Sequence, residues 1–373
     1  MSKKIVYLDN NSTVPLNPII FEKLIELNVF KLPLNPSSIH FYGKTAKDIL
    51  EESRFKIKNS IKAMCHEIIF CSSATESVNI CFNSFDFNRI FAISTDHECA
   101  ISHPKTELIS VDKDGMLDLN LAEEKFKNAN NTTKPNLMSF CIANNQSGVL
   151  QNSKDIVFLC KKYNILTHCD ASQFVGKEML NIGMNDYDFD FVTISGHKIG
   201  AMQGSACLIY RSGLDIRPLM FGGGQEKFKR PSTQNIPAAV SLGMACEIVN
   251  NSNYIKSFQN HTEELKKNLE TFLISKNCVI FGINTNRVSN TTFFAMPSIT
   301  SDIQFVEYDM NNILVSNGSA CSSSKINISH VLIAMNVNKD FIKNAIRIST
   351  SMLNEIDDIE IFKNCFLSLQ NRI

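Results

Sequence analysis

An uncharged hydrophobic segment, residues 191–194, runs directly into Ser195-Gly196-His197-Lys198. Its β-branched and aromatic residues are typical of a strand that is covered on both faces of a parallel sheet, and Gly196 lets the backbone turn sharply. A lysine just after such a strand would lie at the carboxyl end of the sheet, where open α/β folds bind their ligands. Most lysines are exposed on the surface, so Lys198 becomes informative only together with other strand ends.

Two further hydrophobic segments end in groups that complement this lysine. Residues 165–169 form an apolar strand that ends at Asp170, and residues 68–71 lead into Ser72-Ser73-Ala74-Thr75-Glu76-Ser77. Ser73 and Glu76 fit a capping box at the start of a helix, and the N–H groups of a helix N-terminus bind phosphate. An amine for a Schiff base, an acid for a ring nitrogen and a helix N-terminus for a phosphate are the parts of a pyridoxal phosphate site.

With these segments the chain resembles the cysteine desulfurases of the NifS/IscS type, which are fold-type I pyridoxal phosphate enzymes of the class V aminotransferase group. The resemblance extends from Tyr7 to about Ser349. It rests on four segments: Ala74-Thr75-Glu76-Ser77, Asp170-x-x-Gln173, Ser195-Gly196-His197-Lys198 and Gly318-Ser319-Ala320-Cys321. The chain departs from the family pattern at Ser73, Gln146, Ser232 and residues 201–203.

The resemblance implies a set of residues that bind the cofactor pyridoxal 5'-phosphate. Lys198 would form the Schiff base, Asp170 would pair with the pyridine nitrogen, and His97 would stack on the ring and assist proton transfer. The other expected cofactor contacts are Ala74, Thr75, Asn145, Gln173, Ser195, His197 and, across the interface of a homodimer, Thr233.

The resemblance also implies residues that act on the substrate L-cysteine. Only small residues flank Cys321, whereas a cysteine of the hydrophobic core would normally have large apolar neighbours; the resemblance makes Cys321 the catalytic sulfur carrier. Arg347 lies in an alternating segment, residues 345–349, which predicts a strand that turns Arg347 away from its apolar neighbours. By resemblance Arg347 and Asn35 would bind the substrate carboxylate.

Strands and helices alternate through most of the chain, which predicts an α/β fold with a mostly parallel central sheet and helices on both faces. The length of 373 residues, 44% of them hydrophobic, is ample for a sizeable core and suggests two domains, or one large domain with an appendage. We expect a large cofactor-binding domain over residues 16–250. Residues 1–15 and 251–373 would form a smaller α+β domain that carries the Cys321 loop.

Charge and cysteine content limit the remaining function classes. Lys+Arg and Asp+Glu are both 37, so neither nucleic acid nor an anionic membrane is an expected partner. The 12 cysteines include no C-x-x-C pair, and no histidine pair has metal-ligand spacing, so we predict reduced thiols and no metal site. No segment reads as a signal peptide or a membrane span, which favours a cytoplasmic protein.

The implied reaction converts L-cysteine to L-alanine and passes the sulfur, as a persulfide on Cys321, to an acceptor protein, for iron–sulfur cluster assembly or another sulfur-containing cofactor. One alternative is a selenocysteine lyase or another class V lyase or aminotransferase, and an aminotransferase would not need Cys321. A second alternative is a degenerate paralogue that only binds partners, which the departures from the family pattern motivate. The complete set of Lys198, Asp170, His97 and Cys321 argues against it.

Overall fold

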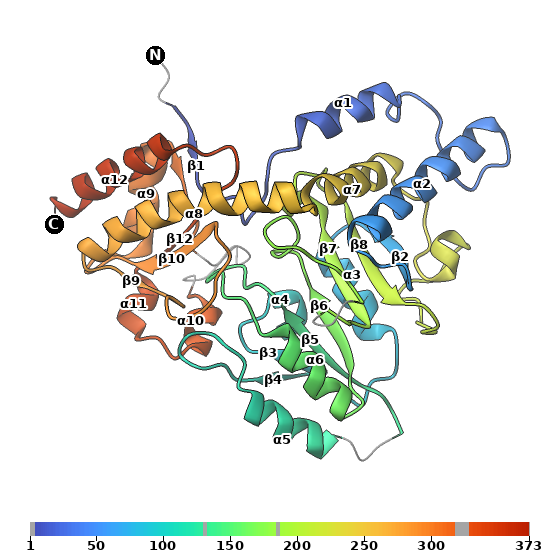
Figure 1. The fold of residues 1–373 in the computed structure, drawn as a ribbon, viewed down its shortest axis with the longest axis horizontal. Coiled ribbons are helices and arrows are strands. Elements are labelled where there is room, and N and C mark those ends of the chain that lie inside the picture. The colour runs from blue at the N-terminus through green and yellow to red at the C-terminus, as the bar shows by residue number, and fades with distance from the viewer. Residues whose placement is uncertain (1–3, 130–132, 184–186, 318–327, 373) are drawn as a thin grey trace.

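A computed structural model describes residues 4–129, 133–183, 187–317 and 328–372 (Figure 1). Its main feature is a seven-stranded sheet. In spatial order the strands are β2 (His66–Cys71), β8 (Ala206–Arg211), β7 (Phe191–Ser195), β6 (Leu166–Asp170), β5 (Asn136–Cys141), β3 (Arg89–Ile93) and β4 (Thr106–Ile109). Strands β7, β6, β5, β3 and β4 are parallel to one another. Strand β8 alone runs in the opposite direction, antiparallel to both β2 and β7. The predicted mostly parallel α/β sheet is confirmed.

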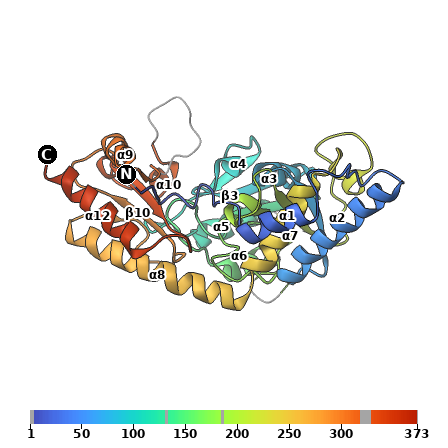
Figure 2. The ribbon, with the colours of Figure 1, turned by 90° about the horizontal axis from the view of Figure 1, so that it is seen from above.

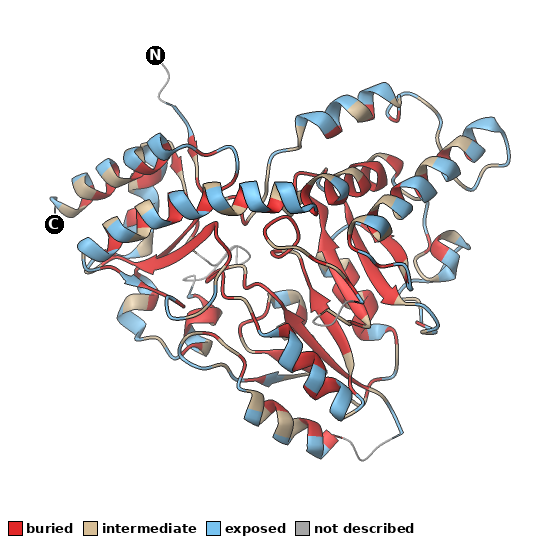
Figure 3. Ribbon diagram, in the orientation of Figure 1, coloured by how far each residue is buried: buried red, intermediate tan, exposed pale blue. Residues whose placement is uncertain are grey.

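Helices cover both faces of this sheet because successive strand residues point to opposite sides. On one face Phe70, Phe140 and Ile194 pack in a large core. The helices of this face are α1 (Pro18–Glu26), α2 (Phe41–Ser60), α5 (Leu119–Ala129), α6 (Ser153–Lys162) and α7 (Ile236–Val249). On the other face Ile69 and Leu208 pack against α3 (Ala74–Asn83) and α4 (Glu98–Ile101). Figure 3 shows the result, with buried strands between helices that are exposed on their outer sides.

A second, smaller sheet is built from the C-terminal third of the chain. The order β12 (Ala345–Ser349), β10 (Thr291–Ala295) and β9 (Val279–Ile280) is antiparallel. Its core includes residues of α8 (Ser252–Ser275), α9 (Ser301–Met310) and α12 (Ile356–Gln370). The short helices α10 (His330–Ala334) and α11 (Lys339–Lys343) pack near its other side. The long α8 runs along one side of the molecule (Figure 2).

The N-terminal segment joins this second part of the molecule. Strand β1 (Val6–Tyr7) pairs in parallel with β11 (Ile313–Leu314), and Asp9 forms a bridge with Ser349. Val6 and Leu8 belong to the same core as Leu265 and Phe362. The expected division of the chain into residues 16–250 and the remainder would need a separate core in each part, such as those around the large and the small sheet. The division and its boundaries stay a prediction. No helix in the described ranges has both the length and the apolar character of a membrane span.

Candidate active site

A cavity of about 620 Å³ lies where the two sheets meet. The carboxyl ends of the parallel strands β5, β6 and β7, the start of α3, the N-terminal segment and β12 all contribute to its wall. Residues from the sequence prediction that line it are Ala74, Thr75, His97, Asn145, Asp170, Gln173, Ser195, His197, Lys198 and Arg347. The structure therefore brings together ten predicted residues from six separate segments of the chain.

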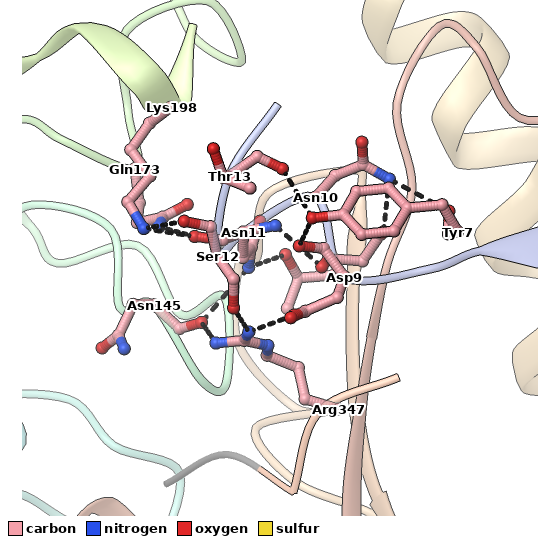
Figure 4. A network of polar contacts seen from close by, with 12 residues as sticks. Tyr7, Asp9, Asn10, Asn11, Ser12, Thr13, Asn145, Gln173, Lys198 and Arg347 are labelled. Atoms are coloured by element: carbon pink, nitrogen blue, oxygen red, sulfur yellow. Dashed lines mark hydrogen bonds and ion pairs between the residues drawn. The ribbon is translucent and has the colours of Figure 1, made fainter. Parts of the chain in front are cut away.

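Lys198 is held against the N-terminal segment. It follows β7 in the short 3₁₀ helix η1 (Gly196–Lys198). Its Nζ donates hydrogen bonds to the backbone carbonyls of Asn11, at 2.8 Å, and Ser12, at 2.6 Å (Figure 4). The turn needs glycine at position 196, because a Cβ there would approach Ser205 Oγ to 2.1 Å and the Ser205 carbonyl to 2.8 Å. The sequence Ser-Gly-His-Lys thus places an amine at the end of a buried strand.

The start of α3 provides hydrogen-bond donors at one end of the cavity. Ser73 is the N-cap, and its hydroxyl accepts from the Glu76 N–H at 3.1 Å. Glu76 in turn accepts from the Ser72 N–H at 2.6 Å and pairs with Arg230 at 2.7 Å. The Ser73 cap fixes the helix start, while Glu76 binds the N–H of Ser72 in place of the Ser73 N–H that the predicted capping box would use. Ala74 and Thr75 line the cavity where the helix dipole favours an anion.

His197 completes this end of the cavity with Ser195. Burial, followed by the charge of Lys198, lowers the pKa of His197 to about 4, so its ring is neutral near pH 7. Nδ1 of His197 lies 3.3 Å from the hydroxyl of Thr13. The neutral ring of His197 and the hydroxyl groups of Ser195 and Thr75, which all line the cavity, can serve as hydrogen-bond partners of a phosphate.

Asp170 and His97 lie on the wall formed by the strand ends. Asp170 is buried at the end of β6, and its Oδ1 accepts from the Ser172 N–H at 2.9 Å. His97 is the N-cap of α4, where Nδ1 accepts from the Cys99 N–H at 3.2 Å. Because a backbone N–H can only donate, Nδ1 is the unprotonated nitrogen, and Nε2 carries the proton of the neutral ring. Burial lowers the pKa of His97, which favours this neutral form.

Arg347 enters the cavity wall from β12. Its side chain is 1% exposed, and Nη2 donates to Asp9 Oδ1 at 2.5 Å and to Ser12 Oγ at 2.8 Å. Nη1 donates to the backbone carbonyl of Asn145 at 3.0 Å (Figure 4). The guanidinium group is thereby fixed in one orientation, with part of its five-donor set still available.

Several buried polar atoms of the cavity wall have no hydrogen-bond partner within the described residues. They are Asn145 Oδ1, Ser172 Oγ and Arg347 Nε. An unsatisfied buried polar group costs about 1–3 kcal/mol, so a bound polar molecule would be stabilised here. The helix start, the acid of Asp170 and the amine of Lys198 match the phosphate, the ring nitrogen and the aldehyde carbon of pyridoxal phosphate in type. The residues therefore fit that cofactor.

Two predicted residues lie away from this cavity, and a third is outside the described residues. Asn35 is in the loop between α1 and α2, where its Oδ1 accepts from the Ser37 N–H at 3.0 Å. Thr233 lines a separate cavity of about 200 Å³ beside Arg230. Cys321 lies outside the described residues, whereas Asn317, which directly precedes the segment 318–327, lines the main cavity. The roles of Asn35, Thr233 and Cys321 stay predictions.

The sequence analysis missed several residues of this site. Asp9, Asn11 and Ser12 connect the N-terminal segment to Lys198 and Arg347. Their signal is a polar run, residues 9–13, that directly follows a short strand. Cys99 also lines the cavity, with Sγ 3.2 Å from Nδ1 of His97, and its position two residues after His97 gave no signal.

Comparison with known proteins yields similarity along almost the whole chain. Residues 6–362 match the family model described as aminotransferase class V. A protein named cysteine desulfurase IscS from Dictyoglomus turgidum is 30% identical over 376 residues, which is 96% of this chain and 92% of the relative. A protein of the same name from Methanosarcina thermophila is 30% identical over 382 residues, 96% of this chain and 90% of the relative.

A solved structure agrees with the sequence relatives. The crystal structure of a NifS-like protein from Rickettsia africae is 34% identical and superposes with a TM-score of 0.90, covering 99% of this chain and 100% of the other. The cavity at the strand ends therefore lies in a chain whose fold and sequence both resemble those proteins.

Proposed function

This chain belongs to the aminotransferase class V family, and from that premise we propose that it is a pyridoxal phosphate-dependent cysteine desulfurase, which converts L-cysteine to L-alanine and passes the sulfur to an acceptor. The observation that carries this proposal is the convergence of Lys198, Asp170 and His97 on one cavity. The relatives named cysteine desulfurase, which match at least 95% of the chain at 30–31% identity, support the substrate.

Each end of the cavity has a part in holding the cofactor. The N-terminal N–H groups of α3, together with Ser195 and His197, would bind the phosphate. Asp170 would keep the pyridine nitrogen protonated, since a carboxylate favours the charged form of a neighbouring base. When bound, pyridoxal phosphate supplies an electron sink for the electrons released at the substrate α-carbon.

Lys198 and His97 would handle the protons. Lys198 Nζ would bind the cofactor covalently and, once displaced by the amino group of the substrate, would remove the α-proton. The carbonyls of Asn11 and Ser12 hold this amine at the cavity wall when it is free of the cofactor. His97 has its Nε2 proton available to donate, and its neutral ring suits general acid–base catalysis near pH 7.

Cys321 would take the sulfur. Its thiolate attacks the sulfur of L-cysteine, so an S–S bond forms while the C–S bond breaks, and the three-carbon product gains a proton and leaves as L-alanine. Cys321 then holds a persulfide for an acceptor protein, which supplies iron–sulfur cluster assembly or a related pathway. Thiolates are strong nucleophiles compared with hydroxyls.

We further propose a homodimer in which Thr233 reaches the partner's phosphate. An apolar patch, defined as Ile39, Phe41, Phe221 and Phe228, supports it, because these side chains are 92%, 75%, 93% and 69% exposed. The two chain segments that carry the patch, residues 39–41 and 221–228, lie close together, since Gln225 Nε2 donates to Ser37 Oγ at 3.5 Å. None of the 11 described cysteines forms a disulfide, which suits a reducing cytoplasm.

Two variants test the proposal against L-cysteine turnover. Purified protein with pyridoxal phosphate should absorb visible light and form alanine, and Lys198→Ala should lose both properties. Cys321→Ser should keep the absorption of the bound cofactor but form no persulfide. A wild-type protein that forms no alanine would refute the activity, and unchanged alanine formation by Cys321→Ser would indicate a lyase or aminotransferase instead.

A further inference from the structure

A second lysine, Lys177, is buried behind the wall of the cavity. It is 6% exposed, and its Nζ donates to Asn11 Oδ1 at 2.7 Å and to Gln173 Oε1 at 2.5 Å. A buried lysine is uncommon unless it is paired with an acid. Both of these partners are neutral amides.

The electrostatic surroundings favour an uncharged amine at Lys177. Burial is the main cause that lowers its pKa, and the positive charges of Lys198 and Arg347 lower it further. A neutral amine has two N–H donors, one for each of the two amide oxygens that Lys177 binds. Holding such a group inside the protein costs stability, so a function for it is worth seeking.

Lys177 supports one orientation of both amides, because its two N–H groups are matched by one oxygen of each amide. Each amide oxygen then faces Lys177 and each amide nitrogen faces away, and Asn290 Nδ2 adds a second donor to Asn11 Oδ1 at 3.2 Å. Accordingly Gln173 Nε2 donates to the Asn11 carbonyl at 2.9 Å. Asn11 Nδ2 donates to Thr291 Oγ1 at 2.9 Å and to the Asn145 carbonyl at 3.2 Å.

This orientation decides which atoms face the site. Gln173 lines the cavity, and with its oxygen held by Lys177 it has its NH₂ group, and not its oxygen, to offer a ligand. The Asn11 carbonyl accepts from both Gln173 and Lys198, so the same network reaches the reactive amine. Figure 4 shows Asn11 between Gln173, Lys198 and Arg347.

We propose that Lys177 is a positioning residue that makes Gln173 present an N–H donor to the phenolic oxygen of the cofactor and holds the Asn11 carbonyl beside Lys198. This inference rests on the proposed function, since it requires pyridoxal phosphate in the cavity. Without Lys177 only the hydrogen bond from Gln173 Nε2 to the Asn11 carbonyl would hold this amide, and the Gln173 oxygen, left without its donor, could turn toward the phenolic oxygen, which is repulsive.

The test is Lys177→Met, which keeps an unbranched side chain but removes the donors. The phenolic oxygen would lose a hydrogen bond and hold the proton of the cofactor–lysine linkage more strongly. The pKa of that linkage, read from a pH titration of the visible absorption, should rise by about one unit, equivalent to roughly a tenfold shift in the protonation equilibrium. Loss of pyridoxal phosphate on dialysis should become roughly tenfold faster.

Lys266→Met is the matched control. Lys266 is also buried, at 7% exposure, but its Nζ donates to the Val288 carbonyl at 3.1 Å and it does not line the cavity. This variant should lose stability and keep the wild-type linkage pKa. If Lys177→Met does not fold, Lys177→Gln carries the same prediction with a smaller shift.

A double variant separates positioning from general damage. If Lys177 acts through Gln173, then Lys177→Met should add nothing to the spectral effect of Gln173→Leu. Unchanged linkage pKa and cofactor retention in Lys177→Met, with normal wild-type turnover, would overturn the inference and leave the proposed function intact. A wild-type protein that gains no visible absorption with pyridoxal phosphate would instead overturn the proposed function.

Discussion

Asn11 ties three distant parts of the chain to one point of the cavity. Its backbone N–H donates to Ser349 Oγ at 2.9 Å, and its side chain contacts Thr291 at 2.9 Å and Lys177 at 2.7 Å. Its carbonyl accepts from Lys198. A single short segment thus joins the small sheet to the reactive lysine, which makes the arrangement of the two sheets a condition for an ordered site.

His97 has a structural and a chemical role that substitutions can separate. In His97→Asn the amide oxygen can still cap α4, whereas the imidazole proton is lost. We expect the kcat for alanine formation to fall by roughly 10²–10⁴-fold, the usual contribution of general acid–base catalysis, while the free energy of unfolding in urea stays close to wild type.

His97→Ala is the matching control for the cap. It should show the same loss of kcat and an additional destabilisation of about 0.5–2 kcal/mol, because the Cys99 N–H loses its acceptor. If both variants retain wild-type kcat, His97 serves only to cap the helix.

Arg347 is expected to bind the substrate carboxylate through the donors that its protein partners leave available. Arg347→Lys keeps the charge but loses the planar fork, so about 1.5–3 kcal/mol of transition-state binding should be lost. That is roughly a ten- to 150-fold decrease in kcat/KM for L-cysteine. The visible absorption of the cofactor should not change.

Arg287→Lys provides the comparison for Arg347→Lys. Arg287 is also buried and pairs with Glu270 at 2.8 Å, but it does not line the cavity. Its substitution should lower the free energy of unfolding and leave kcat/KM unaffected. Wild-type kcat/KM in Arg347→Lys and Arg347→Ala would mean that the carboxylate binds elsewhere.

The chemistry at strand ends could be predicted from sequence more readily than the network behind it. Asp170 and Lys198 directly follow apolar strands, and parallel strands bring their carboxyl ends together. Lys177 gave no comparable signal, because a lysine four residues after Gln173 looks exposed until the fold buries it. The hydrogen bonds of Asn11 connect positions 134 to 338 residues apart, and no local pattern encodes such contacts.

Helices α2 and α7 approach each other closely at one glycine. A Cβ on Gly243 would lie 2.8 Å from the Ser53 carbonyl and 3.0 Å from Ser53 Cα, which are backbone atoms that cannot rotate away. Nearly every residue of α7 around this point is buried. The crossing therefore sets how the helices lie on the large sheet that carries Lys198.

Gly243→Ala should destabilise the protein although alanine favours helices. Overpacking costs typically about 1–3 kcal/mol, which exceeds the roughly 1 kcal/mol that alanine gains over glycine in a helix. Urea denaturation should therefore yield a lower free energy of unfolding. Glu247→Ala, at an exposed position one turn further along α7, should change it by less than about 0.5 kcal/mol. Equal stability of Gly243→Ala and wild type would mean that the helices can separate without cost.

The strands that carry the site followed from composition, whereas their pairing did not. Residues 191–194 and 165–170 form the expected strands, β7 and β6, which the structure pairs in parallel. The antiparallel direction of β8 had no signal in the sequence, since a buried strand is apolar in either direction. Strand β1 has only two residues, and its partner β11 lies more than 300 positions away, so its pairing depends on the finished fold.

The cavity is closed by contributions from both ends of the chain, yet Thr233 lies outside it. Thr233 lines the smaller cavity beside Arg230, and it follows Ser232, whose N–H donates to Gln225 Oε1 at 3.3 Å close to the apolar patch. If Thr233 reaches the partner's phosphate in the proposed homodimer, cofactor retention and dimerisation should be coupled.

Phe221→Asp tests this coupling. Phe221 is 93% exposed, and an aspartate in its place would bring an unpaired charge into the proposed interface, which is costly to bury. Sedimentation should show a dimer for wild type and a larger monomer fraction for the variant at equal concentration, and the monomer should lose pyridoxal phosphate faster on dialysis. Phe158→Asp, on α6 with 70% exposure and outside the patch, should remain dimeric and retain the cofactor.

Thr233→Ala should weaken cofactor retention without dissociating the dimer, because it removes one hydroxyl and leaves the patch intact. A wild-type protein that sediments as an active monomer at all concentrations would contradict both the dimer and the shared phosphate site.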